Sequence, residues 1–218
     1  LALSELWGMT KGEKDDEEIQ KALEAATKVI LRSQNVGGGW RYQPSPDAGQ
    51  DTSVTVMVFI ALASARQAGI LVPDEAIRRV VTYLEGAQNP ASGGFSYSAT
   101  GKGASLACSG GGLYIAQLCG ERDSQMVQAA IDYLKGQPDG IFTQTGFYYY
   151  THYYAMQAVV QTSDEFYAEW YPKIRDALVS KQSPEGSWND GNGGPTVSTG
   201  MSILILGTPH RFIPIYQR

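Results

Sequence analysis

One local pattern occurs four times along this chain, and a repeated pattern restricts the chain to folds in which equal units stack. Each copy has a glutamine at the end of a predicted helix, then a glycine-containing turn, then a large aromatic residue. The aromatic residues recur roughly every 50 residues, which predicts one supersecondary unit per copy. The four pairs are Gln34 with Trp40, Gln88 with Phe95, Gln137 with Phe142, and Gln182 with Trp188.

Two kinds of helix are predicted to alternate between these turns. The first kind carries apolar residues at helical spacing on one face, which is typical of an outer helix. It is expected over residues 15–33, 73–87, 124–135 and 165–181. The second kind has almost no polar face, which predicts a buried inner helix. It is expected over residues 51–67, 104–118, 149–161 and 196–206.

The glutamine, the glycine turn and the aromatic residue resemble the QW-type repeat of the terpenoid cyclase and protein prenyltransferase superfamily, also called the prenyltransferase and squalene oxidase repeat. The resemblance covers residues 17–207, and on it the chain is identified as a catalytically atypical bacterial member. It implies an all-α fold, an α/α toroid or partial α/α barrel of about four and a half helix pairs. A complete ring in this superfamily has six pairs.

The first ten residues, LALSELWGMT, resemble the last half of an inner helix. We therefore expect residues 1–218 to form a single toroid domain that is the carboxy-terminal part of a longer chain.

Composition excludes several classes of function. The chain has 43% hydrophobic residues and a net charge of -5, without a basic stripe for nucleic acid. Its apolar runs are shorter than the ~20 residues of a membrane span, so an integral membrane protein is not expected. Cys108 and Cys119 fall in one predicted helix, roughly 16 Å apart, too far for a disulfide. The sequence predicts a soluble protein and leaves cytoplasmic and exported locations open.

Asp51 is the candidate catalytic residue. In a toroid the inner helices begin at one mouth of the central cavity, and Asp51 opens the first complete inner helix. The resemblance to squalene and hopene cyclases implies protonation of an alkene by an Asp-x-Asp-Asp motif. Here Asp51-Thr52-Ser53-Val54 keeps one acid of the three. The alternative is that Asp51 is a helix N-cap, worth about 1 kcal/mol.

Cys108 and His152 lie on successive predicted inner helices, and both are candidate binding residues. The resemblance to protein prenyltransferase β subunits implies a zinc site made by an aspartate, a cysteine and a histidine. However, the sequence has no carboxylate between Gly94 and Gly120, and catalytic zinc normally has three protein ligands. We therefore expect no metal and no cofactor. The alternative to a binding role is that Cys108 and His152 are core residues.

The segment FYYYTHYYAMQA, residues 147–158, is the richest in aromatic residues. Its rings either form a cavity wall that binds an isoprenoid, a cation or a sugar, or they pack between helix layers. The candidate binding residues here are Tyr148, Tyr150 and Tyr153. Trp40 is a further candidate, although the turn aromatics have a scaffold role in the family.

These observations favour a cyclase-like or prenyltransferase-like repeat domain that binds an apolar ligand or a protein partner without the standard chemistry. The alternative is a terpenoid cyclase or prenyltransferase-type enzyme with an aromatic-lined cavity. Whether it is an enzyme stays open at this stage. A carbohydrate-active α/α barrel is a third possibility, weakened because no paired carboxylates converge.

Overall fold

The computed structural model describes residues 1–10, 15–101 and 103–210, and in these ranges every regular element is a helix. Helix α1 (Ala2–Thr10) is followed by four pairs of an outer and an inner helix. The pairs are α2 (Asp16–Arg32) with α3 (Thr52–Gln67), α4 (Asp74–Ala87) with α5 (Leu106–Leu118), α6 (Gln125–Lys135) with α7 (Tyr148–Thr162), and α8 (Asp164–Lys181) with α9 (Gly194–Leu206).

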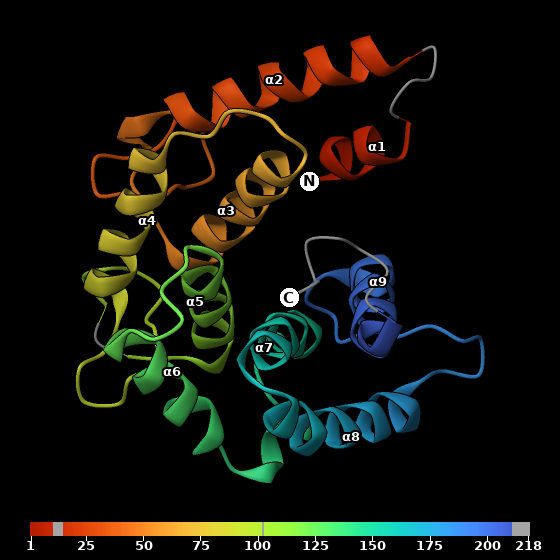
Figure 1. The fold of residues 1–218 in the computed structure, drawn as a ribbon. Coiled ribbons are helices and arrows are strands. Elements are labelled where there is room, and N and C mark those ends of the chain that lie inside the picture. Colours follow the sequence, from red (N-terminus) through yellow and green to blue (C-terminus); the bar gives the residue numbers. More distant parts are fainter. Residues whose placement is uncertain (11–14, 102, 211–218) are drawn as a thin grey trace.

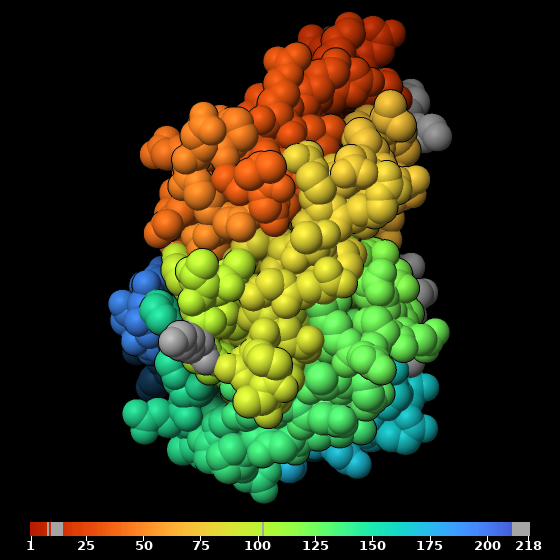
Figure 2. Space-filling model, turned by 90° about the vertical axis from the view of Figure 1, so that its left-hand side faces the viewer, coloured from red at the N-terminus to blue at the C-terminus, as the bar shows by residue number. Residues whose placement is uncertain are grey.

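The pairs follow an arc from α1 to α9, with the outer helices on its convex side (Figure 1). Figure 2 shows this convex surface, on which the chain passes in order from α2 to α4 and α6. The predicted all-α fold, the alternation of outer and inner helices and the count of about four and a half pairs are confirmed for the described residues. Short 3-10 turns lie at Pro46–Ala48, Asp139–Phe142 and Thr208–His210.

The repeated turns join one helix pair to the next. Gln34 Nε2 donates hydrogen bonds to the Gly38 carbonyl at 2.8 Å and to the Ala76 carbonyl, in the first turn of α4, at 2.9 Å. Gln88 makes the same two bonds, to Gly93 and to Met126 of α6, each at 2.8 Å. The repeat glutamine therefore binds its own turn to the next outer helix.

The later copies differ. Gln137 Nε2 donates to the carbonyl of Tyr133, in the preceding helix α6, at 2.9 Å. Gln182 Nε2 donates to the Gly186 carbonyl of its own turn at 2.9 Å. In two copies the aromatic residue also bonds to the preceding outer helix, because the ring nitrogens of Trp40 and Trp188 donate to the carbonyls of Ile30 and Leu178.

Helix α5 packs closely against its neighbours because it contains three consecutive glycines, of which Gly110 faces α7. A Cβ on Gly110 would lie 2.7 Å from the backbone nitrogen of Ala155 in α7. A Cβ on Gly112 would lie 2.6 Å from the Phe95 ring. Side chains at these positions would force the layers apart, which is why the helix tolerates residues that cost about 1 kcal/mol each in helix propensity.

The expectation that the helix over residues 51–67 is buried on all sides is wrong. Helix α3 is an inner helix, but Met57 is 47% exposed, and Val54 on the same face is only half-buried. This apolar face borders a cavity rather than another helix. Among the described residues no helix combines the length and the apolar character that crossing a membrane requires.

Candidate functional site

Asp51 is the N-cap of α3 and is fully buried. Its Oδ1 accepts hydrogen bonds from the Val54 amide at 2.9 Å and the Ser53 hydroxyl at 2.7 Å. Its Oδ2 lies 3.8 Å from Nε of Arg41 and has no hydrogen-bond partner. Each of these neighbours carries a hydrogen-bond donor, the kind of partner that a carboxylate accepts. The cap predicted for Asp51 is therefore present.

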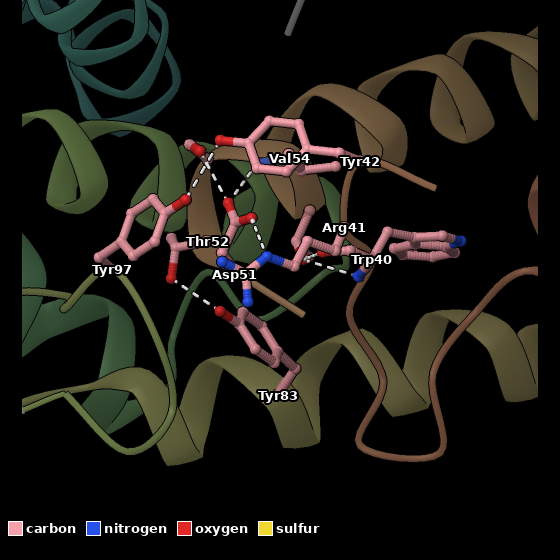
Figure 3. Close-up of polar contacts among 10 residues, drawn as sticks. Trp40, Arg41, Tyr42, Asp51, Thr52, Val54, Tyr83 and Tyr97 are labelled. Carbon is pink, nitrogen blue, oxygen red and sulfur yellow. Dashed lines mark hydrogen bonds and ion pairs between the residues drawn. The ribbon is translucent and has the colours of Figure 1, made fainter. Parts of the chain in front are cut away.

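Three tyrosines surround this cap (Figure 3). The hydroxyls of Tyr42 and Tyr97 lie 3.2 Å apart, and on the other side Tyr83 lies 2.9 Å from the Thr52 hydroxyl. The Tyr42 hydroxyl, burial and the charge of Asp51 raise the pKa of Tyr97 to about 12. Burial raises the pKa of Tyr83 to about 12. The phenols of Tyr83 and Tyr97 therefore stay protonated at neutral pH and act as hydrogen-bonding groups.

An apolar cavity of about 640 Å³ lies beside this cap, where α3, α5 and α7 begin. We call it the apolar chamber. Met57 lines it from α3, Cys108 from α5 and Tyr150 from α7, while Tyr42 and Tyr97 line it from the repeat turns. Burial raises the pKa of the Cys108 thiol, so this residue is a neutral apolar wall rather than a thiolate.

A second cavity, of about 420 Å³, lies between the start of α7 and the loop before α9. We call it the polar chamber. Every lining residue has a side chain that can form hydrogen bonds. The lining includes Gln144, Thr145, Tyr149, Lys181, Asn189, Asp190 and Asn192. A narrow space of about 160 Å³, bordered by Met57, Phe147, Tyr150, Asp190 and Asn192, shares lining residues with both chambers.

Phe147 stands where the chambers meet. It is the N-cap residue of α7, and its backbone is left-handed, with φ 50° and ψ 51°. A bulky residue seldom adopts this conformation, and such strain concentrates at binding sites. The ring is 62% exposed and lines both the apolar chamber and the narrow space.

The structure separates the other candidate residues. Tyr150 and Cys108 line the apolar chamber, and Tyr148 lines the polar one, with Nζ of Lys181 4.9 Å above its ring. His152 and Tyr153 are buried in the core and line neither chamber.

The ring of His152 stacks on Phe142, and its Nε2 lies 3.0 Å from the Ile141 carbonyl. Burial lowers the pKa of His152 to about 4. Trp40 is buried in its turn and lines neither chamber. The structure does not bring Cys108 and His152 into one ligand set, because no group of three or more metal-ligating side chains occurs within the described ranges.

Sequence reasoning missed several lining residues, although the repeat contains the signal for four of them. The second residue after each turn aromatic faces a chamber. These four residues are Tyr42, Tyr97, Gln144 and Asp190. Met57 of α3 and Phe147, the N-cap residue of α7, have no comparable sequence signal. Their apolar character is also what a core position requires.

Two solved structures match 88% of this chain. Both are of the type II terpene cyclase MstE from Scytonema. One, in complex with merosterolic acid A as product, has a TM-score of 0.59 at 20% identity. The fold of this chain is similar to the fold of that cyclase. The other, in complex with geranylgeranyl dihydroxybenzoate as substrate, has a TM-score of 0.57 at 19% identity.

The chain spans 60% and 59% of the length of these two cyclase chains. At such low identity the likeness establishes the α/α toroid architecture and not the chemistry. No family model matches the chain, and no curated protein matches it.

Proposed function

We propose that this chain binds an elongated apolar ligand of the isoprenoid class in the apolar chamber, without acid-initiated cyclisation and without zinc-dependent prenyl transfer. The observation that carries this proposal is the chamber itself. Its volume of about 640 Å³ falls in the range of small-molecule sites, and its walls are mainly aromatic and aliphatic. The two cyclase structures of the same fold contain an isoprenoid-derived substrate and product, which supports this ligand class.

The environment of Asp51 supports ligand binding without protonation of the ligand by this residue. A residue that protonates an alkene must present a neutral carboxyl to its substrate. Oδ1 of Asp51 is instead used by the helix cap, and the Arg41 guanidinium lies beside Oδ2. Asp51 is also absent from the lining of the apolar chamber.

A cyclase remains the second candidate because of one specific observation. Oδ2 of Asp51 is buried without a hydrogen-bond partner, and Ser53, two residues further along the chain, lines the apolar chamber. A modest rearrangement of Tyr42 and Tyr97, whose hydroxyls meet beside this carboxylate, would bring the acid to a ligand (Figure 3).

We also propose that residues 1–218 form one toroid domain within a longer chain, whose remaining part or a protein partner packs along the open side of the arc. Apolar side chains of the inner helices support this, because Met57, Val197 and Ile203 are 45–58% exposed.

Calorimetric titration with farnesol tests the binding proposal. Farnesol is expected to bind the unmodified protein, and Met57→Trp is expected to weaken binding at least tenfold, because the larger ring fills the chamber. Val36→Trp is the matched control, since Val36 is 89% exposed and lines neither chamber. Absence of farnesol binding, or equal binding by Met57→Trp, contradicts the proposal.

Incubation with squalene and with farnesyl diphosphate, followed by analysis of the products, separates binding from catalysis. The proposal predicts unchanged substrates in both reactions. Formation of cyclic products would establish the cyclase reading.

A further inference from the structure

The second residue after each turn aromatic contributes a side chain to one of the two chambers. The chemical character of this side chain changes along the chain. In the first two turns this residue is a tyrosine, Tyr42 or Tyr97, and it faces the apolar chamber. In the last two turns it is Gln144 or Asp190, and it faces the polar chamber. The same repeat position thus contributes tyrosines to the apolar chamber and polar side chains to the polar chamber.

The two chambers border one another around the start of α7, and Thr145 lines both of them. Phe147 and Tyr150 border the apolar chamber and the narrow space, and Asp190 and Asn192 border the narrow space and the polar chamber. A ligand that reaches into both chambers would pass this border. Phe147, held in its left-handed conformation, lies at the junction.

The charges of the polar chamber indicate what kind of group fits there. Lys181 and Asp190 are the charged residues of its lining, one of each sign. A phosphate or diphosphate is normally held by several cationic groups or a metal ion, whereas here the charges balance. The remaining lining is amides, hydroxyls and the Tyr148 and Tyr149 rings, which suits an uncharged group rich in hydroxyls.

Two hydrogen bonds fix the position of Asp190. Its Oδ1 accepts hydrogen bonds from the backbone amide of Asn192 at 3.0 Å and from the Ser198 hydroxyl at 3.5 Å, and the second bond anchors the loop to α9. Burial and then the charge of Asp190 raise the pKa of Tyr149, so its hydroxyl remains a donor beside the carboxylate. The chamber therefore presents both donors and acceptors to a bound group.

We propose that the ligand is an amphiphile, with its apolar chain between Met57 and Tyr150 and an uncharged, hydroxylated head group against Gln144 and Asp190. This inference rests on the proposed function, and it adds the chemistry of the head group. It predicts that the protein distinguishes ligands with the same chain by their polar end.

Three probes with one chain length test this prediction on the full chain: n-octanol, n-octyl β-D-glucoside and n-octyl phosphate, each below the concentration at which it forms micelles. Calorimetry should show that the glucoside binds at least tenfold more tightly than octanol. Octyl phosphate should bind no more tightly than octanol.

Two variants assign the preference to the polar chamber. Asp190→Ala and Gln144→Met are each expected to lower the affinity for the glucoside at least fivefold and to leave octanol within twofold. Because Asp190 also anchors its loop, Gln144→Met serves as the second, independent variant. Asp132→Ala is the control, since Asp132 is exposed on α6 and lines neither chamber.

The outcomes separate the two proposals. If octanol and farnesol both fail to bind, the proposed function is overturned. If they bind but the glucoside has no advantage, or octyl phosphate binds more tightly than the glucoside, only the amphiphile inference is overturned. An advantage for the glucoside that survives in both variants also overturns it.

Discussion

At the scale of single residues, Asp51 decides between a binding protein and an enzyme. In Asp51→Asn the side-chain amide oxygen can still accept hydrogen bonds from the Val54 backbone amide and the Ser53 hydroxyl. In the unmodified protein both groups donate to Oδ1 of Asp51. Asparagine caps helices nearly as well as aspartate, and the ion pair with the half-exposed Arg41 adds little. Thermal unfolding should therefore show a loss of at most about 1 kcal/mol.

The same Asp51→Asn protein should bind farnesol as the unmodified protein does. Asp51→Ala, which cannot cap α3, is the comparison and should lose about 0.5–2 kcal/mol. Turnover of squalene by the unmodified protein that disappears in Asp51→Asn, with stability retained, would contradict the binding proposal and favour the cyclase.

His152 predicts a pH dependence of stability. Burial and the nearby charge of Lys181 lower its pKa to about 4, although the hydrogen bond with Ile141 opposes this. In the unfolded chain its pKa is near 6.5, so the unfolded state binds a proton first as pH falls. Stability is thus fully present above pH 6.5 and is lost between pH 6.5 and about 4.

Denaturant unfolding at pH 7.5 and 5.5 measures this loss, which is expected to be on the order of 1 kcal/mol for His152. His152→Gln should be less stable at both values and should lack this part of the pH dependence. His210→Gln is the control, because His210 is exposed near the end of the described residues. A pH dependence that is unchanged in His152→Gln and abolished in His210→Gln would contradict the assignment.

Residue types alone could not assign the site. The cap of Asp51 was predictable, since aspartate before an apolar run is a known helix start. The division of residues 147–158 was not, because rings on every face of a helix turn look alike in sequence. Backbone geometry places Tyr150 at the apolar chamber and His152 in the core, and that geometry includes the left-handed Phe147 that no sequence rule indicates.

At the scale of helices, Gly110 of α5 sets the distance to α7. A Cβ on Gly110 would approach the Ala155 backbone to 2.7 Å, and a backbone atom cannot rotate away as a side chain can. Gly110→Ala would gain up to about 1 kcal/mol in helix propensity and lose about 1–3 kcal/mol to overpacking. We therefore expect a net destabilisation on the order of 1 kcal/mol in denaturant unfolding.

Gly200→Ala is the matched control. Gly200 also lies within an inner helix, α9, but a Cβ there meets no atom within 4 Å. The helix propensity then acts alone, and stability should rise by up to about 1 kcal/mol. Equal effects of the two substitutions would show that close packing of α5 against α7 is not what requires glycine.

Helix positions were predictable at this scale because each helix kind has its own periodicity. All four outer and four inner helices begin and end within a few residues of the expected bounds. Burial was harder to predict, as α3 shows. Its apolar face could have belonged to a core or to a cavity wall, and hydrophobicity favours both equally.

At the scale of the whole molecule, the arc predicts a gradient of local stability. Helices α5 and α7 lie in its middle and are almost completely buried. Helix α9 buries only Ser198, Ser202 and Ile205 among its described residues. Helix α1 packs through Leu3 and Trp7 against a small separate cluster.

Hydrogen exchange followed by mass spectrometry measures this gradient. Local opening costs most where burial is greatest, so amides of α5 and α7 should exchange last, at least tenfold more slowly than those of α1. Helix α9 should fall between them. Because neighbouring pairs stabilise one another in a repeat array, exchange should slow from each end of the arc toward α5 and α7. Equal protection of α1 and α5 would mean that the helices open as one unit and would contradict the gradient.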